Sequence, residues 1–167
     1  MCIRDRIATD IPAEEQGTGM LFNMDGEVVG MISSSVWNDT GKNVVNAYGI
    51  SDLKPIIELL INGKSVPYIG IYGTTVTEQL AEEHKMPSGI YVADVDPDSP
   101  AMAAGIQIGD IICEASGEEI KDIAAYQNIV IGSSVGETME FVGKRLGSDG
   151  YVNIKFSVVT TEKEEVK

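Results

Sequence analysis

The sequence predicts a mainly β chain with short helices, divided into two domains. Short apolar runs bounded by Gly, Asp and Pro recur along its length, as is typical of strands joined by tight turns. Few stretches have the three- and four-residue apolar spacing of a helix. The small, polar segment 62–67 separates two differently patterned halves. We therefore expect one domain over residues 1–66, a second over 67–159 and a disordered, charged tail over 160–167.

Composition argues against several classes of partner and site. The 167-residue chain has 12 Lys and Arg against 26 Asp and Glu, and its net charge of −14 would repel a nucleic-acid backbone. No apolar run is long enough to cross a bilayer, and residues 1–6, which look foreign to the domain, are followed by no export signal. Cys2 and Cys113 are too far apart for a CxxC motif. We expect neither a metal nor a cofactor.

The first domain is expected to begin with a hairpin. Asp25 and Gly26 lie between two apolar runs, and this residue pair favours a tight turn, so residues 21–32 are predicted to form two paired strands. A polar loop follows, and then a strand over 43–48.

A helix is predicted after this strand. Ser51 and Asp52 provide an N-cap and an acidic first turn, and Gly63 is placed to end the helix. Its apolar residues recur on one face, which we expect to be buried. These residues are Leu53, Ile56, Ile57, Leu60 and Ile61.

Capping residues mark the helices of the second domain. Ser99 caps a short helix, with Pro100 at its first position and Gly105 at its end. Asp122 caps a longer helix over 122–131, whose apolar residues share one side. The other elements are a helix over 77–84 and strands over 69–72, 89–95, 111–115, 116–120, 138–145 and 151–159.

The second domain resembles a permuted PDZ domain of the kind found in HtrA (DegP/DegQ/DegS-like) serine proteases. Three motifs carry the resemblance in the right order: Tyr68-Ile69-Gly70-Ile71, similar to the carboxylate-binding loop, then residues 95–106, and then residues 108–112. The resemblance implies that an extended peptide adds as an antiparallel strand along residues 71–75, beside the helix over 122–131. Backbone amides of the loop would bind its terminal carboxylate, and Gly70 would allow that close approach.

The resemblance extends to the first domain, which is similar to the last quarter of the trypsin-like protease domain and implies a partial β-barrel. The position of the family's nucleophile is occupied by Gly17, which has no side chain to attack a carbonyl. Thr18 is the neighbouring hydroxyl, and Gly17 and Gly19 flank it. The chain's one histidine, His84, lies in the second domain, so no Ser-His-Asp triad can be assembled. Whether the chain is an enzyme is left open.

Other ionisable candidates have structural interpretations. His84 lies near the end of a helix, where it favours the helix dipole. Asp94, Asp96 and Asp98 lack the ligand pattern of a calcium loop and are expected to serve as turn and capping residues.

The resemblance therefore implies a module that binds peptides or unfolded proteins with apolar C-termini, and no nucleic acid. Two alternatives stay open: a fragment of an active HtrA-like endopeptidase in protein quality control, and an independent interaction protein. By resemblance, the parent protein would work outside the cytoplasm, membrane-tethered and homo-oligomeric. The predicted peptide-binding residues are Tyr68, Ile69, Gly70, Ile71, Tyr72, Ile123, Tyr126, Gln127 and Val130.

Overall fold

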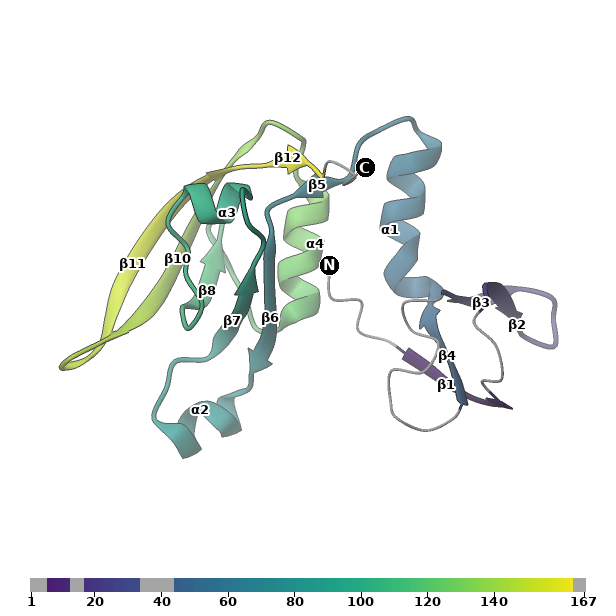
Figure 1. Ribbon diagram of the computed structural model, residues 1–167, viewed down its shortest axis with the longest axis horizontal. Coiled ribbons are helices and arrows are strands. Elements are labelled where there is room, and N and C mark those ends of the chain that lie inside the picture. The colour runs from purple at the N-terminus through teal and green to yellow at the C-terminus, as the bar shows by residue number, and fades with distance from the viewer. Residues whose placement is uncertain (1–5, 13–16, 34–43, 164–167) are drawn as a thin grey trace. The chain divides into compact units, whose positions relative to one another are not determined.

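The computed structural model of this chain describes residues 6–12, 17–33 and 44–163 (Figure 1). They form two compact units, one ending at Lys64 and the other beginning at Ser65, within the predicted linker. Strands dominate both units and the helices are short, so the predicted fold class is confirmed.

The first unit is a four-stranded antiparallel sheet in the order β1-β4-β3-β2, followed by one helix. The predicted hairpin is present, with a longer turn than the Asp-Gly pair suggests. Asn23 N–H donates to the Glu27 carbonyl at 2.9 Å, and Gly26 has a positive φ of 81°. The elements are β1 (Arg6–Pro12), β2 (Gly19–Phe22), β3 (Val28–Ile32), β4 (Val44–Gly49) and α1 (Ile50–Ile61).

Helix α1 differs from its prediction at its start and along its apolar face. It begins at Ile50, and Gly49 stands at the N-cap position without a side-chain cap, so the predicted cap is wrong. Only Leu53 is buried, whereas Leu60 and Ile61 are 59% and 75% exposed. Figure 1 shows the helix leaving the end of β4 and extending beyond the sheet formed by the described strands of this unit. Periodicity thus identified an apolar face that the described part of this unit leaves largely exposed.

The second unit is built on an antiparallel sheet in the order β11-β10-β8-β7-β6, with β9 paired to β8 and a separate pair formed by β12 and β5 (Figure 1). Its strands are β5 (Pro67–Tyr68), β6 (Ile71–Val76), β7 (Gly89–Val95), β8 (Ile111–Ala115), β9 (Glu118–Glu119), β10 (Thr138–Gly147), β11 (Gly150–Val159) and β12 (Thr161–Glu162). Its helices are α2 (Glu78–His84), α3 (Pro100–Ala103) and α4 (Ile123–Gly132).

One hydrophobic cluster fills this unit. Ile90, Ile112 and Phe141 are fully buried in it, and the ring of Tyr126 from α4 lies 6.5 Å from that of Phe141. Helix α4 is therefore fixed to the sheet by core packing.

The predicted caps of α3 and α4 are confirmed. Ser99 Oγ accepts from Met102 N at 3.2 Å, and Asp122 Oδ1 accepts from Ala125 N at 2.8 Å. No helix in the described ranges has the length and apolar character that crossing a membrane requires.

The prediction of a disordered tail is wrong for residues 160–163, while residues 164–167 lie outside the described part. Thr160 is 1% exposed, and its hydroxyl donates to the Ser134 carbonyl at 2.6 Å. Strand β12 then pairs with β5, placing Thr161 opposite Tyr68. The charged composition favours disorder. It could not reveal the contacts that order this segment, because their partners are distant in sequence.

Candidate functional site

The segment between β5 and β6 is a turn whose two carbonyls accept hydrogen bonds from backbone amides of the same unit. The Ile69 carbonyl accepts from Ala101 N at 3.0 Å, and the Gly70 carbonyl accepts from Asp96 N at 2.9 Å. The described residues contain no cis peptide bond, and in a trans peptide plane the N–H points opposite to the carbonyl. The amides of Gly70 and Ile71 therefore point away from α3 and from Asp96.

Gly70 is required here by the fold itself. It has a positive φ of 91°, and a Cβ at this position would lie 2.6 Å from Ser99 Oγ and 2.9 Å from Tyr68 Oη. The family resemblance implies a different reason, which is the close approach of a ligand. Any substitution of Gly70 therefore tests the fold together with binding.

Strand β6 is the terminal strand of its sheet. It pairs with β7 along one side, from Ile71 opposite Val95 to Val76 opposite Gly89. In the described part of the chain, no strand pairs with its other side. This leaves a sheet edge of the kind that can accept another strand.

Helix α4 runs beside β6 and is joined to it at its start. Thr75 Oγ1 on β6 accepts a hydrogen bond from Ile123 N at 3.1 Å, directly after the Asp122 cap (Figure 1). The sequence predicted the helix and its cap, but the hydrogen bond between elements 48 residues apart carries no local signal.

Five of the predicted peptide-binding residues pack together in the hydrophobic cluster of this unit. None of the five apolar side chains is more than 7% exposed, and Gln127 is half-buried. An apolar ligand side chain would therefore have to part them. These five are Ile69, Ile71, Ile123, Tyr126 and Val130.

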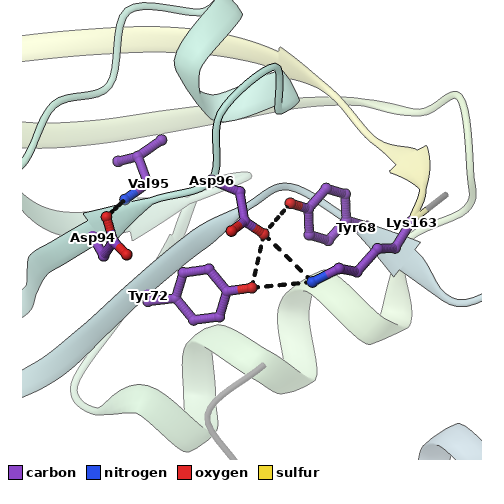
Figure 2. Close-up of polar contacts among 6 residues, drawn as sticks. All are labelled: Tyr68, Tyr72, Asp94, Val95, Asp96 and Lys163. Atoms are coloured by element: carbon purple, nitrogen blue, oxygen red, sulfur yellow. Dashed lines mark hydrogen bonds and ion pairs between the residues drawn. The ribbon is translucent and has the colours of Figure 1, made fainter. Parts of the chain in front are cut away.

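Tyr68 and Tyr72, the two remaining predicted site residues, share one carboxylate. Both hydroxyls donate to Asp96 Oδ2, the second at 2.7 Å, and Lys163 Nζ donates to Tyr72 Oη at 3.1 Å (Figure 2). Asp96 is thus the centre of a hydrogen-bonded network directly behind the turn. Its sequence interpretation as a turn or capping residue missed this, because every partner is far away in the chain.

The network shifts the ionisation of its members. Burial, and next the hydrogen bond to Asp96, raise the pKa of Tyr68 well above its ordinary value. The Tyr68 hydrogen bond is the main cause that lowers the pKa of Asp96, against the opposing effect of burial. The pKa of Lys163 is raised, chiefly by its hydrogen bond to Tyr72. At neutral pH the network therefore holds two neutral phenols, one carboxylate and one ammonium.

The candidates at the family's nucleophile position lie in the first unit. Gly17 is half-buried and Thr18 is exposed, in the segment that leads into β2, which Gly19 begins. The preceding residues 13–16 lie outside the described part. His84 is exposed in the last turn of α2, in the other unit.

Comparison with known proteins finds relatives that match most of this chain. Residues 91–145 match the family model described as "PDZ domain". The chain is 30% identical over 155 residues to the "Probable periplasmic serine endoprotease DegP-like" of Halomonas elongata, and 30% identical over 160 residues to the "Serine protease Do-like HtrA" of Bacillus subtilis. These matches cover 89% and 88% of this chain, but 32% and 34% of the two relatives. The chain thus spans about a third of the length of these curated relatives.

The fold is similar as well. The solved structure titled "HtrA-type protease AlgW with decapeptide" matches with a TM-score of 0.55 at 21% identity, covering 89% of this chain and 46% of that chain. Because the match includes most of this chain, the likeness of fold extends beyond the PDZ domain.

Proposed function

This chain belongs to the HtrA family of serine proteases, and we propose that its PDZ domain binds the C-terminal ends of other polypeptides by strand addition. The observation that carries the proposal is the edge of β6, which lies beside α4 and which no other described strand than β7 pairs with. This edge starts at a turn whose Gly70 and Ile71 amides point away from α3 and Asp96.

The binding mode follows from these elements. An extended peptide would pair antiparallel with β6 through main-chain hydrogen bonds, which hold any sequence. Its terminal carboxylate would accept hydrogen bonds from the turn amides, which are charge-assisted and therefore stronger than neutral ones. Affinity would depend on having a free C-terminus.

Selectivity would come from the last side chain of the ligand. It would lie against the cluster that contains Ile69, Ile71 and Val130, which favours apolar residues. Because these side chains are already packed, a small residue such as Val should be accepted more readily than Phe. The net charge of −14 should disfavour acidic peptides, an effect that salt weakens.

Calorimetric titration of the chain tests this proposal. A peptide ending in Val with a free carboxylate should bind at least about tenfold more tightly than the same peptide amidated, because amidation removes charge-assisted hydrogen bonds. Peptides ending in Phe and in Asp should follow in that order. Equal affinity for the acid and the amide would refute the role assigned to the turn.

We also propose that the chain, as it stands, does not cleave peptides. The support is Gly17 at the nucleophile position, which has no side chain to attack a carbonyl. Incubation with an unfolded substrate such as reduced casein should give no cleavage products. Turnover that Thr18→Ala abolishes would instead favour the alternative, a fragment of an active endopeptidase in protein quality control.

For the parent protein we propose a site of action outside the cytoplasm, in a membrane-tethered homo-oligomer. Relatives named as periplasmic endoproteases support the location at the level of the family. Fractionation of cells that express the full reading frame, followed by sedimentation of the extracted protein, would test all three statements.

A further inference from the structure

The short strand β12 brings a basic residue to the turn of the proposed peptide site. It pairs with β5, placing Glu162 opposite Pro67 and Thr161 opposite Tyr68. The buried Thr160 anchors this strand from the other end. Lys163 is therefore carried to the two residues that precede the Ile69–Gly70 segment, although it is distant from them in sequence.

The ammonium of Lys163 has four contacts in this place. Its Nζ lies 3.1 Å from Tyr72 Oη and 3.4 Å from Asp96 Oδ2, and 5.2 Å and 5.9 Å from the ring centroids of Tyr68 and Tyr72 (Figure 2). A single cation thus holds both phenol rings and their shared carboxylate.

The charge of Asp96 is relevant to peptide binding because the backbone of Asp96 is hydrogen-bonded to the turn. Asp96 N donates to the Gly70 carbonyl at 2.9 Å. Its carboxylate accepts from Tyr68 Oη, which would lie 2.9 Å from a Cβ on Gly70, so the negative charge is close to the amides that would receive the ligand. An unpaired negative charge there would repel a ligand carboxylate, in a chain whose net charge is already −14. Lys163 is the basic residue that the described part of the chain pairs with Asp96.

We infer that Lys163 is a positioning residue of the peptide site: it neutralises Asp96 and holds Tyr68 and Tyr72, which makes β12 part of the carboxylate-binding turn. The inference rests on the proposed peptide binding. The proposed role of Lys163 differs from a purely structural role for β12, because it depends on the charge of Lys163 reducing the repulsion of the ligand carboxylate.

The experiment compares the affinities of a Val-ending peptide, as acid and as amide, for the full chain and its variants. Lys163→Gln should weaken binding of the acid about three- to fivefold, and binding of the amide less than about 1.5-fold, since the repulsion acts on the carboxylate. Lys163→Arg should restore the acid's affinity. So should Asp96→Asn in the Lys163→Gln background, because Asn is neutral and its oxygen still accepts hydrogen bonds.

Lys155→Gln provides a matched control. It removes the same charge from an exposed position on β11, the opposite edge of the sheet, and should leave both affinities unchanged. Thermal unfolding of each variant verifies that the domain is folded.

The outcomes separate the two claims. A wild-type chain that binds acid and amide equally would refute the proposed function and this inference with it. If the wild type prefers the acid and Lys163→Gln retains that preference in full, only the inference is overturned. An equal loss for acid and amide that Arg does not restore would also overturn it, because it would indicate a structural role alone.

Discussion

The two units of this chain bury their apolar side chains to very different extents. In the second unit one cluster joins the sheet to α4, and Phe141 at its centre is fully buried. Among the described residues of the first unit, the core cluster consists of Ile32, Val45 and Ala47, and Phe22 is 60% exposed. Apolar periodicity thus predicts which face of an element is apolar, whereas the burial of that face depends on whether other elements of the chain pack against it.

The comparison predicts different behaviour when the units are separated. Residues 65–167 should fold alone with a cooperative thermal transition, because their core is complete. Residues 1–64 alone should show no such transition, since the described part has so small a core. Differential scanning calorimetry of both pieces provides the measurement. A cooperative transition in residues 1–64 would contradict the predicted difference between the two units.

One phenylalanine from each unit allows the two cores to be compared directly. Phe141→Ala should reduce the free energy of unfolding by about 3–5 kcal/mol, because it leaves a cavity in the closed core and removes the partner of Tyr126. Phe22→Ala should change it by less than about 0.5 kcal/mol, because the ring is largely exposed. Urea unfolding of both variants measures these changes. Similar losses in the free energy of unfolding for the two variants would contradict the predicted difference between the units.

Two glycines form a second pair, with a smaller effect. Gly70→Ala should cost about 2–4 kcal/mol, since it combines a left-handed backbone with a clash against Ser99. Gly26→Ala has a similar φ but open space around it, and should cost about 1 kcal/mol. Chemical denaturation would reveal whether the steric component distinguishes them.

The smallest predicted effect concerns acid stability. The folded pKa of Asp96 is lowered from its ordinary 3.8, so the stability it contributes is present above that pH and is lost as the pH falls through the folded value. Between about pH 5 and pH 3, the wild type should therefore lose more stability than Asp96→Asn, by less than about 1 kcal/mol. Urea unfolding at both pH values tests this. Identical losses would show that the network does not stabilise the ionised carboxylate.

Much of the second unit could be predicted from the sequence because its signals are local. Ser99 and Asp122 cap their helices through bonds to residues three positions away, and the sequence places them correctly. The reason for Gly70 and the role of Lys163 could not be predicted. Each depends on a partner that only the folded chain brings near: Ser99 for the glycine, and Asp96 for the lysine.

The most direct measurement of the central claim is a nuclear magnetic resonance titration of the isotope-labelled chain with a Val-ending peptide. We expect the largest amide shifts at Ile69, Gly70 and Ile71 and further shifts along β6. Amidation of the peptide should reduce the shifts at the turn. Shifts confined to another surface, such as α2, or an unchanged turn with the free acid bound, would contradict it.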